Sequence, residues 1–255
     1  MEFKLSRKKI LVTNDDGING EGLKVLVESL KKVCDVYILA PDSNRSAVSS
    51  KITMDKPLNY RKLGEKTFTC SGTPCDCVIS AFTSSLFDFK FDAVVSGINA
   101  GPNMGTDVVY SGTCAAARQA VLMNVPGIAV SLESEYFDYA RDGFNFKSLA
   151  DFVANNLDSL IALSSGGVFV NINATSAASY SEAVFASGCI RDYGDEVHFE
   201  GGEDEFSGSC STQEIKIYGD EDCDYKIARS GKIAVSLVYA EPVLKKVNQK
   251  IQFKF

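Results

Sequence analysis

The stretch that decides the fold is Lys9-Ile10-Leu11-Val12-Thr13-Asn14-Asp15-Asp16-Gly17. Its apolar run is typical of a strand buried on both faces of a sheet, and the run ends at an amide, two carboxylates and a glycine. Neighbouring strand residues point to opposite faces, so Asp15 and Asp16 can converge only where the backbone turns, which Gly17 permits. Adjacent carboxylates repel, and a divalent cation is the usual reason to keep them together. The alternative is a polar turn in which an aspartate caps the next helix.

Strand and helix patterns alternate outward from this stretch. Residues 20–32 carry apolar side chains at helical spacing, and residues 35–40 indicate a second buried strand, so the unit is βαβ with parallel strands. Further strands are predicted at 67–70, 91–95, 127–131 and 168–172, and further helices at 73–82, 111–123 and 146–163. Beyond about residue 174 the segments become short and alternating, with strands expected at 215–218 and 233–239. The pattern predicts an α/β fold with a mostly parallel sheet and a β-rich C-terminal extension.

Composition excludes several classes of function. The chain has 255 residues and a net charge of −7, which argues against a binder of nucleic acid polymers. No run approaches the roughly 20 apolar residues of a membrane span, and the basic N-terminus is not followed by the apolar segment of a secretion signal. Eight cysteines without paired CxxC spacing indicate reduced, mostly buried thiols. A cytoplasmic location is expected.

His198 is the only histidine, and it lies in an acidic, glycine-rich segment. A nucleophile activated by histidine would have to use this residue, and a site with several histidine ligands is impossible. Any metal must therefore be bound by oxygen ligands or thiolates, and oxygen ligands select hard ions such as Mg²⁺, Mn²⁺ or Ca²⁺.

Polar loops follow three successive strands, at residues 14–16, 43–46 and 96–99. In an open parallel sheet, ligands bind outside the carboxyl ends of the strands, so these loops are expected to meet. Two carboxylates, a hydroxyl and an amide carbonyl, completed by water, would form an octahedral cation site. The glycine-rich loop at 100–107 and the helix that starts at Ser111 add N–H groups suited to phosphate. A cation beside an anion cradle favours phosphoryl chemistry.

The residues also match a known family. The segments ILVTNDDG (10–17), APDSNRSA (40–47), SGTPCDCV (71–78), SGINAGPNMGTD (96–107) and YSGT (110–113) make the chain resemble the SurE (survival protein E) family of metal-dependent 5'-nucleotidases. The resemblance implies a single SurE-like α/β domain over residues 1–255, with a Rossmann-like three-layer core at 1–174. Residues 175–255 would form the extension and a C-terminal arm, for assembly into a homodimer or homotetramer.

The same resemblance implies an activity and a set of site residues. The expected reaction is hydrolysis of nucleoside 5'-monophosphates, with 3'-nucleotides and short polyphosphate left open, using one Mg²⁺ or Mn²⁺ per subunit. The implied metal ligands are Asp15, Asp16, Ser46 and Asn99. The implied phosphate site is lined by Asn14, Asn103, Ser111 and Gly112. Asp15, Asp16 and Asn14 would be the catalytic residues, with Asp16 the principal ligand and Asp15 the candidate base.

Three other functions are alternatives for the same residues. A phosphatase of the haloacid dehalogenase type needs an aspartate nucleophile where this chain has Asn14, and a dinucleotide-binding oxidoreductase needs a glycine-rich loop where this one is acidic. A non-catalytic nucleotide- and metal-binding regulatory module on the same fold stays possible. Outside the implied site, Arg45 is expected either to approach the substrate phosphate or to be an exposed loop residue. His198 is expected to be a surface residue, Asp42 to cap a turn, and Asp107 to bond loop amides.

Overall fold

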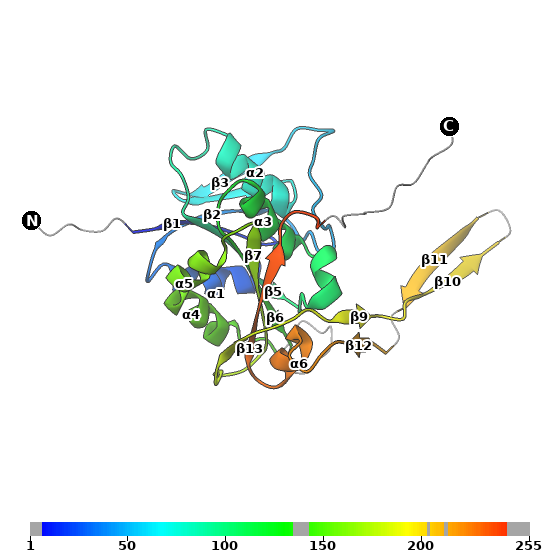
Figure 1. Cartoon of the computed structure of the whole chain (residues 1–255). Coiled ribbons are helices and arrows are strands. Elements are labelled where there is room, and N and C mark those ends of the chain that lie inside the picture. Colours follow the sequence, from blue (N-terminus) through cyan, green and yellow to red (C-terminus); the bar gives the residue numbers. More distant parts are fainter. Residues whose placement is uncertain (1–6, 135–142, 203–204, 212–213, 244–255) are drawn as a thin grey trace, which may run out of the picture.

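A computed structural model of the chain describes residues 7–134, 143–202, 205–211 and 214–243. Its centre is a nine-stranded sheet with the strand order β3-β4-β2-β1-β5-β6-β7-β13-β8 (Figure 1). These strands are β1 (Lys9–Thr13), β2 (Asp35–Pro41), β3 (Tyr60–Gly64), β4 (Thr67–Cys70), β5 (Ala93–Ala100), β6 (Gly127–Glu133), β7 (Val168–Thr175), β8 (Ala183–Phe185) and β13 (Ile233–Tyr239). The strands from β4 to β7 along that order pair in parallel, whereas β3 and β13 run antiparallel to β4 and β7. The α/β prediction with a mostly parallel sheet is confirmed.

Helices cover both faces of the sheet. The helices are α1 (Glu21–Leu30), α2 (Pro74–Thr83), α3 (Gly112–Leu122), α4 (Phe146–Asn155), α5 (Leu157–Leu163) and α6 (Asp224–Arg229), with a 3₁₀ turn, η1 (Gly105–Val109). Alternate residues of β1 point to opposite faces: Ile10 and Val12 pack with α1 and α4, and Leu11 packs with α2 and α3. This alternation explains why the strand is apolar throughout, because both of its faces are buried.

Two helix starts follow directly from the sequence. At α2, Thr73 and Asp76 form a reciprocal capping box, with the Asp76 N–H donating to Thr73 Oγ1 and the Thr73 N–H donating to Asp76 Oδ2. At α3, the Ser111 hydroxyl accepts the Cys114 N–H at 3.0 Å. Each cap satisfies backbone donors that the first turn of a helix leaves unbonded.

The structure corrects several predicted elements. The helix predicted over residues 146–163 is two helices, α4 and α5, which meet at Asn156, whose amide donates to the Phe152 carbonyl. β3 and α6 were not predicted. The predicted core boundary at residue 174 is also wrong for the sheet, because β8 and β13 come from later in the chain and pair into it. A β-strand can join a sheet from any distance along the chain, so periodicity could not place it.

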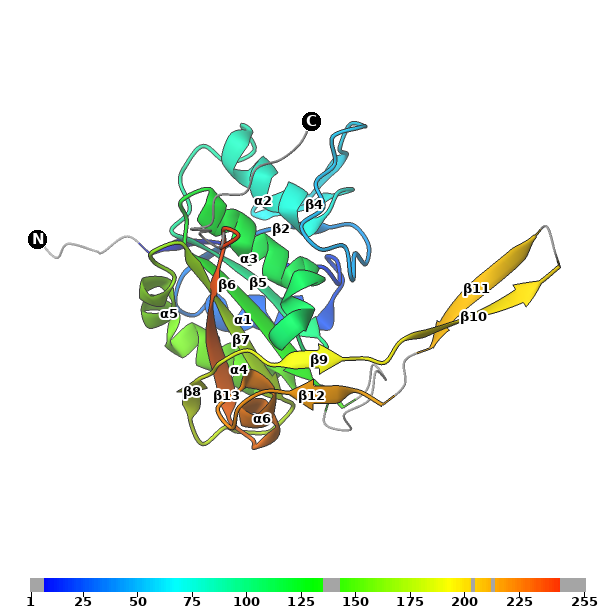
Figure 2. The same cartoon turned by 45° about the vertical axis from the view of Figure 1, so that its right-hand side comes forward.

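The rest of the C-terminal segment forms two small sheets beside the main body. β9 (Ile190–Asp192) pairs with β12 (Lys216–Tyr218), and β10 (Glu196–Gly201) pairs with β11 (Phe206–Ser211) in a hairpin. Figure 2 shows this hairpin projecting away from the sheet, whereas β9 and α6 lie close to it. The extension therefore has an outer part, the hairpin, and an inner part that packs on the body. Within the described ranges, no helix is long and apolar enough to cross a bilayer.

Candidate active site

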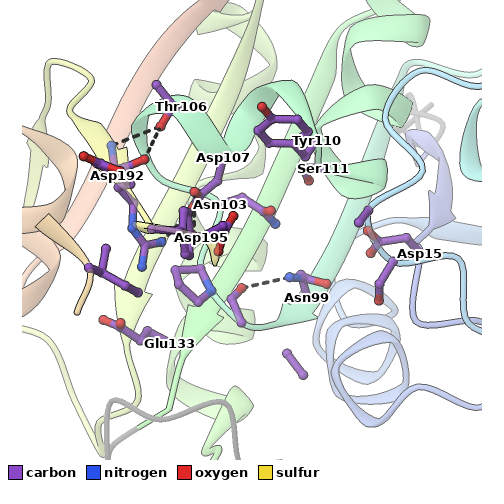
Figure 3. A pocket seen from close by; sticks show the side chains of 18 of the residues that line it. Asp15, Asn99, Asn103, Thr106, Asp107, Tyr110, Ser111, Glu133, Asp192 and Asp195 are labelled. Carbon is purple, nitrogen blue, oxygen red and sulfur yellow. Dashed lines mark hydrogen bonds and ion pairs between the residues drawn. The ribbon is translucent and has the colours of Figure 1, made fainter. Parts of the chain in front are cut away.

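A cavity of about 930 Å³ opens at the carboxyl ends of the parallel strands (Figure 3). β1 lies between β2 and β5, so the chain crosses to one side of β1 and then to the other. Ligands of open α/β sheets bind at such a switch point. The cavity lining includes the predicted site residues Asp15, Ser46, Asn99, Asn103 and Ser111. It also includes residues that were not predicted, from β6, β9 and α6: Glu133, Arg191 and Arg229.

Asp15 is the most buried of the predicted ligands, with 3% of its surface exposed. Its carboxylate accepts two hydrogen bonds from Thr113 in the first turn of α3, from the hydroxyl at 2.5 Å and from the N–H at 3.2 Å. The pKa of Asp15 is raised to about 6, chiefly by burial and also by the charge of Asp16, while the bonds from Thr113 oppose the rise. A buried carboxylate held by neutral donors beside a second acid is an environment that favours a bound cation.

Gly17 and Gly112 allow the backbone to come this close to the site. Gly17 has φ +92°, and a Cβ there would lie 2.9 Å from the carbonyl carbon of Ser43. A Cβ on Gly112 would lie 2.8 Å from the Cβ of Asp15 and 2.9 Å from its Oδ2. The start of α3 therefore rests directly on the Asp15 side chain, which only glycine permits.

Asp16 links the ends of β1 and β5, and Asn99 lies at the end of β5. Asp16 is half-buried, and its Oδ2 accepts the Ala100 N–H at 3.2 Å. Asn99 donates its side-chain N–H to the Gly101 carbonyl at 2.9 Å, which commits the nitrogen and leaves the oxygen as the possible ligand atom. In Figure 3 that oxygen lies on the side of Asp15. Among the described residues, Asp16 is not in the cavity lining, whereas its neighbour Asp15 is.

The loop after β2 brings Ser46 to the cavity. The Arg45 N–H donates to the Asp15 carbonyl at 2.6 Å, and this bond ties the loop to the end of β1. The Arg45 side chain is half-buried and donates to the carbonyls of Ser71 and Gly72, so the prediction of an exposed surface arginine is wrong. Ser46 itself is exposed and lines the cavity.

Asn14 is placed differently from its predicted position in the phosphate site. Its side chain is fully buried, donates to the Gly17 carbonyl at 2.9 Å and accepts the Gly17 N–H at 3.1 Å. Both ends of the amide therefore close the turn that carries Asp15 and Asp16. Of the residues that the structure describes, Asn14 is not in the cavity lining.

Asn103 is held by an amide network that the sequence did not reveal. Asn173 accepts the Asn103 N–H at 2.8 Å and donates to its carbonyl at 3.1 Å, and Asn171 donates to the same carbonyl. The Asn103 side-chain N–H donates to Ser131 Oγ at 2.7 Å. Asn171 and Asn173 are two residues apart in an otherwise apolar strand and share one face, and this polar pair was the available signal.

Two ion pairs occupy the end of the cavity away from Asp15. Arg191 donates from Nη1 to Asp107 Oδ2, and the Tyr193 hydroxyl donates to Asp107 Oδ1 at 2.7 Å. Burial raises the pKa of Asp107, and the charge of Arg191 is the strongest influence against the rise. Arg229 binds Glu133 through two bonds of 2.8 and 2.7 Å. The predicted bond of Asp107 to loop amides is confirmed at Met104, at 3.4 Å, but its ion pair was not predicted.

The remaining predictions concern residues outside the cavity. His198 lies in the projecting hairpin with 58% of its side chain exposed, as expected of a surface residue. Asp42 is exposed and bonds Ser43 and Arg45. All eight cysteines are free, and each except Cys210 is buried.

The donor atoms fit a hard cation. Asp15, Asp16, Ser46 and Asn99 offer carboxylate, hydroxyl and amide oxygens, which are the ligands of Mg²⁺ and Mn²⁺. In the part of the chain that the structure describes, no group of three or more histidine, cysteine or acidic residues is arranged to hold a metal, so a cation here would rely on the hydroxyl and amide oxygens as well as on the two carboxylates.

Comparisons with known proteins match most of the chain. A family model described as "Survival protein SurE" matches residues 10–193. The protein named 5'-nucleotidase SurE from Treponema pallidum is 46% identical over 181 residues, which cover 70% of this chain and 96% of that protein. Its namesake from Geotalea daltonii is 46% identical over 144 residues, 56% of each chain. The crystal structure of SurE protein from Aquifex aeolicus has a TM-score of 0.78 and 27% identity, over 92% of this chain and 94% of that one.

Proposed function

The chain belongs to the SurE family, and from this premise we propose that it hydrolyses nucleoside 5'-monophosphates to nucleoside and phosphate. The observation that carries the proposal is the meeting of Asp15, Ser46, Asn99, Asn103 and Ser111 on one cavity at the switch point of the sheet. The cavity volume of about 930 Å³ is large enough for a nucleotide, whereas a phosphate ion alone would fill only a small part of it.

We propose that one divalent cation, Mg²⁺ or Mn²⁺, is held by Asp15, Asp16, Ser46 and Asn99. The burial of Asp15 beside Asp16 supports this assignment, because the two charges need compensation. When bound, the cation would supply positive charge for the phosphate oxygens and for the charge that develops in the transition state.

Side chains and backbone N–H groups of the protein would bind the phosphate and activate the attacking water. The N–H groups at the start of α3, with Ser111 and Gly112, and the amide of Asn103 would bind the non-bridging phosphate oxygens. Asp15 is the candidate base, which takes a proton from the attacking water at its carboxylate, and Asp16 is the principal cation ligand. Asn14 acts on the site through the turn at Gly17, which its amide closes.

Phosphate release from a panel of 5'- and 3'-nucleoside monophosphates and short polyphosphate tests this function. The panel is run with Mg²⁺, with Mn²⁺ and with EDTA. We expect release from 5'-nucleotides with metal, none with EDTA, and loss of activity in Asp16→Asn. Asp158→Asn is the control, because Asp158 is a surface acid with 81% of its side chain exposed. Folded, metal-loaded protein that releases no phosphate would favour a non-catalytic nucleotide- and metal-binding module.

We also propose a homodimer or homotetramer assembled through the extension. The support is the projecting β10–β11 hairpin, which carries Val197 and Phe199 with 55% and 67% of their surfaces exposed. Light scattering of the full chain and of Phe199→Ser tests the assembly, and an unchanged mass would exclude a role for this side chain. The free thiols support the proposal of a reducing cytoplasm.

A further inference from the structure

The loop that leads to the start of α3, residues 103–111, is held by a distant part of the chain. Its Gly105 N–H donates to Asp224 Oδ2 of α6 at 2.6 Å. Its Thr106 N–H donates to the Cys189 carbonyl at 3.1 Å, just before β9. The inner part of the extension therefore touches the loop that carries the proposed phosphate-binding residues.

Asp107 is the residue through which this loop and the start of α3 are connected. Its carbonyl accepts the N–H groups of Tyr110 and Ser111 at 2.9 and 3.1 Å. Ser111 in turn caps α3 and lines the cavity. The position of the Asp107 residue thus sets the position of the Ser111 hydroxyl and of the first N–H groups of α3.

Arg191 of β9 holds Asp107 from the other side. The two side chains form an ion pair with only 3% and 10% exposed, and the Tyr193 hydroxyl binds the second carboxylate oxygen. The backbone of Arg191 adds two bonds to Thr106, because its N–H donates to Oγ1 at 3.0 Å and its carbonyl accepts from the same hydroxyl at 3.2 Å. Arg191 of the extension therefore binds two adjacent residues of η1, Thr106 and Asp107.

We propose that Arg191 is a positioning residue for phosphate binding, acting through Asp107 on the Ser111 turn. The inference rests on the proposed function, since it assumes that phosphate binds at the start of α3. It also assigns a role to the extension beyond assembly, because β9 completes the support of the site. The proposed cation ligands come from other elements, so Arg191 should not affect the cation.

The consequence of losing the guanidinium follows from the burial of its partner. Asp107 would keep a largely buried carboxylate without its cation, and the loop would shift to hydrate it. A displacement of the Ser111 turn by about 1 Å is enough to weaken a well-positioned anion site by about 10-fold to 100-fold. The ends of β1 and β5 would keep their positions.

The test compares Arg191→Met, Arg191→Lys and Tyr193→Phe with the wild type, as full chains. Arg7→Met is the control, because Arg7 is also tied to the backbone, at the carbonyls of Lys31 and Cys34, and lies outside the cavity lining. Calorimetry measures the binding of Mg²⁺ and then of inorganic phosphate, and hydrogen exchange measures protection of residues 103–113.

We expect Arg191→Met to weaken phosphate binding by about 10-fold to 100-fold, with Mg²⁺ binding within about 2-fold of wild type. Exchange should rise in residues 103–113 and not in β5 or β6. Arg191→Lys should recover part of the loss, and Tyr193→Phe, which removes one hydroxyl, should weaken binding less than Arg191→Met. Arg7→Met should bind phosphate as the wild type does.

Three results would overturn the inference. They are unchanged phosphate binding in Arg191→Met, a rise in exchange across the whole sheet, or an equal loss of Mg²⁺ binding. If Arg191→Met does not fold, Tyr193→Phe decides, and wild-type binding and exchange in that variant reject the proposal. Wild-type protein that binds phosphate without turning over any nucleotide would reject the proposed function and leave this test intact.

Discussion

The two ends of the cavity treat buried acids in opposite ways. At one end, Glu133 and Asp107 each face an arginine, and both pairs are largely buried. At the other end, Asp15 is held by the neutral donors of Thr113, and the nearby Asp16 raises its pKa further. Arginines compensate the acids at the first end, and we propose that a cation does so at the second. The difference teaches that acids with arginine partners hold loops in place, whereas the paired aspartates are suited to bind a cation.

The largest expected effect that tests this contrast is the loss of activity in Asp15→Asn. The variant should lose about 10³-fold or more in kcat/KM, about 4 kcal/mol of transition-state stabilisation, because it removes a ligand and the candidate base together. Steady-state phosphate release, with metal binding measured in parallel, checks the result, and Asp158→Asn is the matched surface control. Near wild-type turnover with metal bound would show that Asp15 is not the base.

The next effect is on stability at the opposite end. Arg229→Met leaves the carboxylate of Glu133, 5% exposed, without its guanidinium. We expect the free energy of unfolding to fall by about 3 kcal/mol, and Tm by about 6 to 12 °C. Urea and thermal unfolding measure both quantities. The double variant Glu133→Gln, Arg229→Met should recover most of the loss, and equal stabilities of Arg229→Met and wild type would remove the contrast between the two ends.

The pH dependence of the metal-free protein gives a third test. The pKa of Asp15 is raised from 3.8 to about 6 on folding, so the folded state binds this proton more tightly than the unfolded state. The stability from this group is complete below pH 3.8 and is lost as the pH rises through about 6.

In EDTA, the free energy of unfolding should therefore fall by up to about 3 kcal/mol between about pH 4 and pH 7 from this group alone. Chemical unfolding across this pH range measures the fall, and the Asp15→Asn variant should lack that share of it. Identical pH profiles in the two proteins would mean that Asp15 does not carry an uncompensated charge.

The smallest effect concerns an exposed acid that has cations around it. Lys147, followed by Ser29, lowers the pKa of Asp151 to about 2, the reverse of the shift at Asp15. Its stability contribution is present above pH 3.8 and is lost as the pH falls through about 2. Because 37% of the side chain is exposed, we expect Asp151→Asn to cost less than about 1 kcal/mol at neutral pH. Acid unfolding of the variant should start from this lower stability and show a shallower loss; a larger cost would show that exposure does not govern the size of these effects.

Local sequence patterns were sufficient to predict the parallel sheet and most residues of the candidate site. Three features can be recognised from neighbouring residues alone: the change from apolar to polar residues at Asp15 and Asp16, the helix cap at Ser111 and the strand end at Asn99. The parallel sheet then places them together. Periodicity and turn chemistry act over a few residues, so they can be recognised without coordinates. Most of the predicted site residues line one cavity because the parallel strands end at the same edge of the sheet.

Only the tertiary structure determined which residues form the ion pairs at the other end of the cavity. Arg191 and Asp107 are 84 residues apart, and Arg229 and Glu133 are 96 apart, with no local pattern that links them. The pairing depends on β13 joining the sheet and on β9 and α6 packing beside it, and strand pairing has no fixed distance along the chain. Asn14 shows the same limit on a small scale, because its neighbours are compatible with a ligand contact or a turn, and only the folded backbone directs its amide to Gly17.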